Sequence, residues 1–130
     1  MRVIDRKIRD GIRNLKSFKR GSSELCICKD ERGYLIVEYL LHHNRIAVIE
    51  YNDAKGHYVL WIRDCGWRTR TTKDRLNAIL SIFGTNCSIY QKNHEWYLTY
   101  GNGTVSAYWI GSEKIPLGID PFIKEIDNGN

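Results

Sequence analysis

The basic residues near the start of the chain have types and a spacing that could do chemistry. Six of them recur every three or four residues, which predicts one side of a helix: Arg2, Arg6, Arg9, Arg13, Lys16 and Arg20. Guanidinium groups form forked hydrogen bonds to phosphate and carboxylate groups. Like charges at this spacing also cost a helix about 0.2–0.5 kcal/mol per pair, and a bound polyanion would remove that cost. The row therefore predicts a polyanion-binding surface, and a solvated outer helix face is the alternative.

A second group of cations lies between residues 63 and 75 and is interleaved with aromatic residues. It comprises Arg63, Arg68, Arg70, Lys73 and Arg75, with Trp61 and Trp67 beside them. Such a combination suits single-stranded nucleic acid, because bases stack on aromatic rings while cations follow the backbone. A helix expected to start near Thr71 and Thr72 would add backbone N–H groups that favour phosphate. The alternative is that both tryptophans pack in the core, and the neighbouring Gly66 favours this for Trp67.

Cysteine and histidine residues offer weaker possibilities. Cys26 and Cys28 lie on one face of an expected strand, and His42 and His43 end the next strand, but no second pair has zinc-site spacing. Reduced buried thiols are the expectation, with no metal and no cofactor. A metal-independent nuclease would need a histidine near an acidic group or a second histidine. A nuclease would have to draw these groups from His42, His43, His57, His94, Asp53 and Asp64. Nothing in their spacing brings them together, so we predict no catalytic residue.

Composition indicates one folded domain that meets an acidic partner. The chain has 130 residues and a formal net charge of +5. Residues 1–21 hold eight of the 20 Lys and Arg residues but only two of the 15 acidic ones. This asymmetry is typical of a protein that binds nucleic acid or an acidic protein surface. No apolar run is long enough to cross a bilayer, and the basic first residues lead into no apolar segment, so we expect an intracellular protein that does not engage membranes.

The elements that must position these residues follow from hydrophobic periodicity. Apolar residues from Ile4 to Phe18 predict a helix that Gly21 ends. A second helix is expected over residues 72–83, begun by a Thr-x-x-Asp cap at Thr71. Period-two alternation predicts strands at 24–29, 34–42, 45–51, 57–63, 87–92, 95–100 and 104–110. The sum is an α+β domain over residues 1–115 with a mostly antiparallel sheet of about seven strands, followed by a tail over 116–130.

Two stretches of the chain are similar to a small domain family of tailed-phage and prophage genomes. Leu41-His42-His43-Asn44-Arg45-Ile46-Ala47 resembles the family pattern Leu-His-Gly-Asn-x-Ile-Ala, with His43 in place of glycine. Gly66-Trp67-x-Thr69-x-Thr71-Thr72-x-x-Arg75-Leu76-Asn77 resembles a second pattern, and the element order is similar over residues 1–100. The resemblance implies a phage or mobile-element origin and a place of action in the host cytoplasm. It implies no particular activity.

The sequence thus predicts a phage or mobile-element accessory protein that binds nucleic acid or a nucleoprotein complex through its basic surfaces. A host-defence inhibitor of the anti-CRISPR type, acting by protein contact, is the alternative, and a small nuclease is a third hypothesis. The choice between DNA and RNA stays open. Strand edges and twelve Trp and Tyr residues also allow a homodimer.

Overall fold

The computed structural model describes residues 2–122 and shows two α-helices, nine strands and one short 3-10 helix within them. The helices are α1 (Val3–Asn14), α2 (Arg70–Ile82) and the 3-10 helix η1 (Gly101–Gly103). The strands are β1 (Phe18–Arg20), β2 (Ser23–Lys29), β3 (Leu35–Leu41), β4 (Asn44–Asn52), β5 (His57–Arg63), β6 (Ser88–Lys92), β7 (Glu95–Tyr100), β8 (Val105–Tyr108) and β9 (Ser112–Gly118). The expected α+β class is confirmed.

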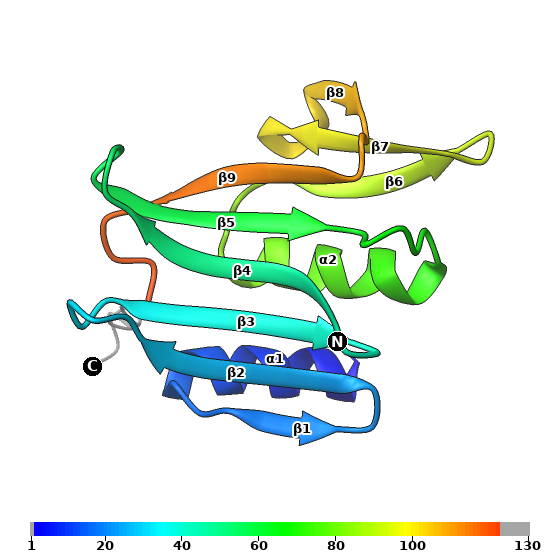
Figure 1. The fold of residues 1–130 in the computed structure, drawn as a ribbon. Helices are drawn as coiled ribbons and strands as arrows, with labels where there is room; N and C mark the ends of the chain where they lie inside the picture. Colours follow the sequence, from blue (N-terminus) through cyan, green and yellow to red (C-terminus); the bar gives the residue numbers. More distant parts are fainter. Residues whose placement is uncertain (1, 123–130) are drawn as a thin grey trace, which may run out of the picture.

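The strands form two antiparallel sheets (Figure 1). The larger sheet has the order β1-β2-β3-β4-β5-β9, and the smaller sheet has the order β6-β7-β8. The chain leaves the large sheet after β5, forms α2 and the small sheet, and returns to the large sheet as β9 beside β5. This return brings the segment between β8 and β9 next to the start of the loop that precedes α2, where the Asp64 N–H donates to the Gly111 carbonyl at 3.0 Å.

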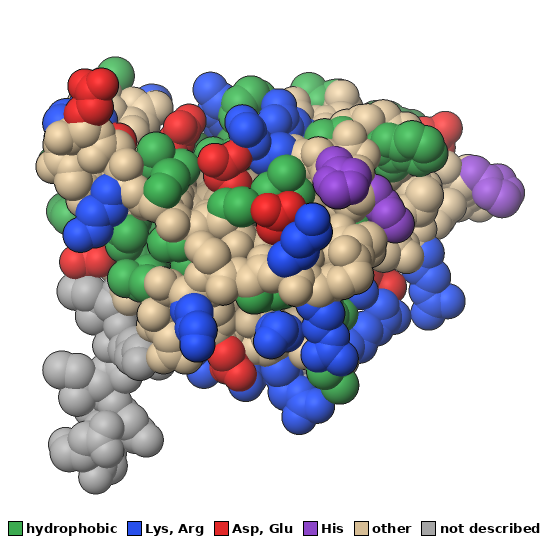
Figure 2. Space-filling view, turned by 60° about the horizontal axis from the view of Figure 1, so that its bottom comes forward, with side chains coloured by type: hydrophobic (Ala, Val, Ile, Leu, Met, Phe, Trp, Pro, Cys, Tyr) green, Lys and Arg blue, Asp and Glu red, His purple; other side chains and the backbone are tan. Residues whose placement is uncertain are grey.

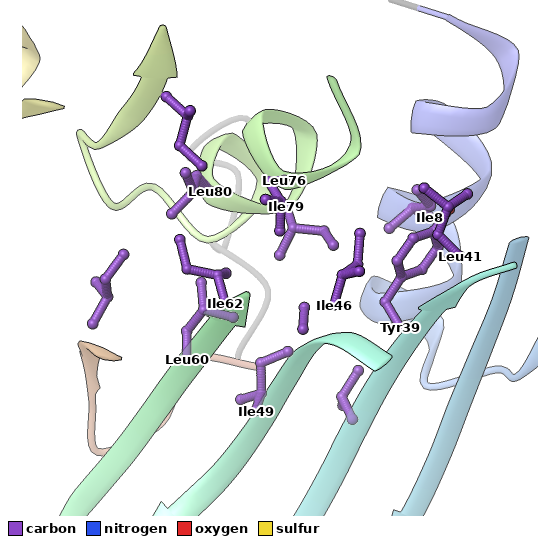
Figure 3. Close-up of a cluster of buried hydrophobic side chains, with 14 of the residues drawn as sticks. Ile8, Tyr39, Leu41, Ile46, Ile49, Leu60, Ile62, Leu76, Ile79 and Leu80 are labelled. Carbon is purple, nitrogen blue, oxygen red and sulfur yellow. The ribbon is translucent and has the colours of Figure 1, made fainter. Parts of the chain in front are cut away.

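Both helices cover the same face of the large sheet and enclose the core (Figure 3). In α2, apolar residues at helical spacing point at the inward residues of β4 and β5, and in α1 Ile8 lies against β3. The labelled side chains that meet here are Leu76, Ile79, Leu80, Ile46, Ile49, Leu60, Ile62, Ile8, Tyr39 and Leu41, all at most 3 % exposed. Burial of this apolar surface is the main force that fixes the two helices against the sheet.

The first helix is shorter than the periodicity predicts. It ends at Asn14, because Leu15 adopts the left-handed conformation (φ 53°) and its N–H caps the helix by bonding carbonyl oxygens of the last turn. The chain then turns back, and the Ser17 Oγ accepts a hydrogen bond of 2.9 Å from the Ile27 N–H of β2. Phe18 therefore packs against the core from β1 and not from α1. The expected helical extension to residue 20 is wrong.

The large sheet gains two edge strands that the alternation pattern did not predict. These are β1 and β9, and β9 continues through Pro116 to Gly118, which the sequence assigned to the tail. The remainder of that tail, residues 123–130, lies outside the described residues. In the described part of the chain, neither helix is long and apolar enough to span a membrane.

Candidate nucleic-acid interface on the two helices

The two basic segments of the sequence meet where α1 and α2 lie side by side. Arg2, at the start of α1, forms an ion pair of 2.8 Å with Oδ2 of Asp74. Arg70, the first residue of α2, places its Nε 3.8 Å from the same oxygen. One carboxylate therefore gathers two guanidinium groups that are far apart in the sequence. The two arginines and the one carboxylate leave an excess of one positive charge. The Arg70 side chain is 85 % exposed.

The outer side of α1 continues this basic surface. Arg6 and Arg13 are exposed, and within residues 2–122 neither forms an ion pair. Arg9 lies between them and is half-buried beside Asp10, with Nε 3.2 Å from Oδ1. Figure 2, turned to bring the β1 edge forward, shows Lys and Arg side chains gathered along the lower and right-hand parts of the molecule. The helix surface is thus positive over much of its length.

Lys16 and Arg20 do not belong to this helical row. Lys16 follows the left-handed Leu15 in the loop after α1, and Arg20 ends β1 at the edge of the large sheet. Both are exposed. Their predicted place on the helix is corrected, because the helix that was expected to carry them ends at Asn14.

Arg75 is a buried structural residue. Its side chain is 13 % exposed and its Nη1 donates to Asp5 Oδ1 at 3.3 Å, which joins α2 to α1. Its Nε has no hydrogen-bond partner in the described structure. The Tyr39 hydroxyl nearby bonds Ser23, and burial raises the pKa of this phenol. Arg75 therefore cannot offer its guanidinium to an outside partner as the sequence suggested.

Arg63 lies on the opposite face of the large sheet. Trp61 alternates with the buried Leu60 and Ile62, so its ring faces away from the helices. The guanidinium of Arg63 lies 4.7 Å from the Trp61 ring centroid, and the ammonium of Lys114 lies 5.4 Å from it. Two cations already interact with this ring, so stacking of a base on it is not expected.

Asp64 organises the loop before α2. Its carboxylate is buried and accepts hydrogen bonds from the Trp109 Nε1 at 2.7 Å, the Gly66 N–H at 2.8 Å and the Arg68 Nε at 3.2 Å. Arg68 also donates to the Trp109 carbonyl at 3.3 Å. Arg68 is therefore a positioning residue for the loop and not a mobile surface cation. These hydrogen-bond donors compensate for the burial of the Asp64 carboxyl group.

This loop presents Trp67 to solvent. The Trp67 side chain is 59 % exposed, so packing in the core, which its neighbour Gly66 favoured, is wrong. It borders a cavity of about 470 Å³, which is also lined by His42, Asn44, Thr69 and Thr72. Thr69 is the helix cap, because its Oγ1 accepts from the Thr72 N–H at 3.2 Å; the sequence placed this cap two residues later. An aromatic ring and a hollow therefore lie just before α2, and Arg70 does not line the hollow.

The histidines lie at three separate turns. His42 and His43 form the β3–β4 turn with positive φ angles of 50° and 67°, so His43 takes the conformation that glycine favours. His94 lies in the β6–β7 turn, and His57 starts β5 with Nδ1 2.9 Å from the Tyr58 carbonyl oxygen. Among the described residues, no three His, Cys, Asp or Glu side chains gather as a metal site. The four cysteines form no disulfide bond, and their expected burial is wrong, because Cys28 and Cys65 are exposed and Cys26 and Cys87 are half-buried.

Sequence reasoning missed several residues that shape this region. Asp74 joins the two basic segments, a role that the sequence pattern does not give it. The sequence could have identified Asp64 as a structural residue, since an acidic residue at the end of an apolar strand needs hydrogen-bond donors when it is buried. Three cross-strand tyrosines, Tyr90, Tyr97 and Tyr108, stack in a row across the small sheet with ring centroids 5.2 and 5.0 Å apart. The hairpin register implied by the alternation pattern could have predicted that row.

Comparison with known protein families gives a match over most of the chain. The family model described as Kyanoviridae Gp96 protein matches residues 1–115. A search of curated proteins and a search of solved structures each found no match. The matched range contains both helices and both basic segments.

Proposed function

Because the chain belongs to the Kyanoviridae Gp96 family of phage proteins, we propose that it works in the host cytoplasm by binding nucleic acid, or a nucleoprotein complex, through the basic surface of α1 and α2. The surface is defined by the exposed cations Arg2, Arg6, Arg13 and Arg70, together with Lys73, which is half-buried in the first turn of α2. The observation that carries the proposal is the meeting of Arg2 and Arg70 on one oxygen of Asp74.

The charge on this surface is only partly compensated within the molecule. Asp74 faces two arginines, and Arg6 and Arg13 have no ion pair in the described part of the chain. A row of phosphates would neutralise these groups and release the counterions condensed on the nucleic acid. Each arginine can also form a forked hydrogen bond to a phosphate, which fixes the position of the backbone.

Trp67 favours a single-stranded ligand. Its exposed ring lies three residues before Arg70 in the chain and borders the cavity before α2. A base that has left a duplex can stack on such a ring, at about 1–3 kcal/mol per base, whereas a paired base cannot reach it. The proposal is therefore a strand whose phosphates follow the helices and of which one base lies at Trp67.

The experiment is a fluorescence-anisotropy titration of a labelled oligonucleotide over a range of salt concentrations. Five phosphate contacts predict a slope of log K against log salt of about −3.5 for a single strand. Arg6→Ala and Arg13→Ala should each make the slope shallower by about 0.7. Lys55→Ala, which removes one charge from the exposed β4–β5 turn, is the matched control and should leave the slope unchanged.

The same experiment separates the alternatives. Absence of binding at about 50 mM salt, together with recovery of a host defence complex on the protein, would favour the anti-CRISPR-type inhibitor. Degradation of the oligonucleotide, lost on replacement of one histidine by alanine without weaker binding, would favour the nuclease. The first result would contradict nucleic-acid binding, and the second would contradict the proposal that the protein acts by binding alone.

A further inference from the structure

The outer edge of β8 differs from every other sheet edge in the described chain. Edge strands offer unpaired N–H and C=O groups, and proteins usually protect them with charged residues or proline. In the large sheet, β1 carries Lys19 and Arg20, and β9 carries Lys114 and Pro116. In the small sheet, β6 ends in Lys92. The segment 104–110, which contains β8, has neither a charged residue nor a proline.

This edge is open and apolar. All four residues of β8 are exposed, and β8 pairs with β7 alone. Val105 is 58 % exposed, Tyr108 66 % and Ile110 81 %. The Trp109 N–H bonds the Trp96 carbonyl on the β7 side at 3.0 Å, so by alternation the backbone groups of Ser106 and Tyr108 point away from β7. These groups form a short template for another strand.

We propose that β8 is the interface between two copies of this chain, which pair antiparallel about a twofold axis at Ala107. In that register, Ser106 of each copy exchanges both of its backbone hydrogen bonds with Tyr108 of the other. The side chains suit this arrangement, because the small Ala107 lies at the axis and Val105 lies beside it on the same face of the strand. The pairing closes on itself and leaves no further edge of β8 open.

The absence of charge on this edge permits a second copy as the occupant. Each chain has a formal net charge of +5, so two copies repel each other wherever their basic surfaces approach. The uncharged edge of β8 lets them meet without placing like charges opposite each other. It also has no charged group with which to select an acidic or basic foreign peptide. Because the strand is short and specific interfaces usually bury more than ~1,000 Å², we expect a dissociation constant on the order of 10 µM.

The test is sedimentation by analytical ultracentrifugation at concentrations from about 5 to about 500 µM. The wild-type chain should change from monomer to dimer over this range. Ala107→Lys alone and Ala107→Glu alone should each remain monomeric, since like charges would meet at the axis. An equimolar mixture of the two variants should form a heterodimer, and Ala107→Ser, the neutral control, should dimerise like the wild type.

Two results would overturn the proposal: a wild-type chain that stays monomeric over the whole range, or charged variants that dimerise as well as the wild type. If circular dichroism shows that the charged variants do not fold, Ser106→Pro decides. It removes an N–H that points away from β7 and so spares the pairing within the small sheet. A dimeric Ser106→Pro chain would exclude this register. None of these outcomes depends on nucleic-acid binding.

Discussion

The outer side of the two helices and the junction between them use the same residue types in opposite ways. On the outer side Arg70 is 85 % exposed and only 3.8 Å from its nearest carboxylate oxygen. At the junction, five residues along the same helix, Arg75 is 13 % exposed and bonds Asp5. The first arginine can exchange its partner for a phosphate, whereas the second holds α1 and α2 together. Net charge alone therefore does not locate a binding surface; the burial of each cation does.

The largest expected effect concerns the junction. Asp5→Ala leaves Arg75 buried without its carboxylate, which should lower the free energy of unfolding by about 3–5 kcal/mol. Asp10→Ala removes the same group from an exposed pair with Arg9 and should cost less than about 1 kcal/mol. Urea unfolding followed by circular dichroism measures both. If both variants lost the same free energy of unfolding, the Asp5–Arg75 pair would stabilise the fold no more than the exposed Asp10–Arg9 pair does.

The next effect concerns the exposed ring beside the basic surface. Trp67→Ala should weaken binding of a single-stranded oligonucleotide about ten- to a hundredfold, because one stacked base is lost. Trp67→Phe keeps an aromatic face and should retain most of the affinity. Since the ring is 59 % exposed, thermal unfolding of both variants should match the wild type. An unchanged affinity in Trp67→Ala, measured by anisotropy, would restrict the interface to the two helices.

A smaller effect lies at the joint between the two sheets, where a partly buried pair depends on pH. The Tyr100 hydroxyl donates to the Glu113 carboxylate at 2.8 Å, and burial together with this carboxylate raises the pKa of Tyr100 to about 12. The folded state holds the phenolic proton more tightly than the unfolded state, whose pKa is about 10. This contribution to stability is therefore complete below pH 10 and is lost as the pH rises from 10 to 12.

Tyr100→Phe tests that joint. The variant should unfold with about 1 kcal/mol less free energy at neutral pH, since Glu113 loses a hydrogen-bond donor. It should also show a weaker decline of stability between pH 10 and pH 12 than the wild type. Denaturant unfolding at a series of pH values measures both effects. If the stability of Tyr100→Phe declined as steeply as that of the wild type, a group other than Tyr100 would cause the alkaline loss of stability.

Periodicity predicted the elements in which neighbouring residues alone determine the structure. The second helix, the β3–β4 hairpin and the β6–β7 hairpin lie where apolar spacing and turn residues place them. The end of α1 was missed because its left-handed cap is Leu15, whereas glycine usually occupies that position. The strand β9 was missed because its pairing with β5 depends on the return of the chain across the molecule, which no local pattern encodes.

The candidate site was predicted in part for the same reason. Exposed cations on one helix face follow from spacing, so Arg6 and Arg13 lie where the sequence placed them. The positions of Arg68 and Arg75 depend on carboxylates distant in sequence or held by the fold, Asp64 and Asp5. Those partners become neighbours only when the helices pack on the sheet. A sequence can count charges, but tertiary contacts decide which of them face outward.

The most direct measurement of the central claim is the affinity of Asp74→Asn for a single-stranded oligonucleotide. Asp74 is the carboxylate that holds both Arg2 and Arg70, so its neutralisation releases two guanidinium groups on the proposed surface. The account predicts that binding becomes about tenfold tighter at ~50 mM salt and that the salt slope steepens by about 0.7. Damage to the fold cannot produce such a gain. An affinity equal to or below that of the wild type would contradict the assignment of this surface to nucleic acid.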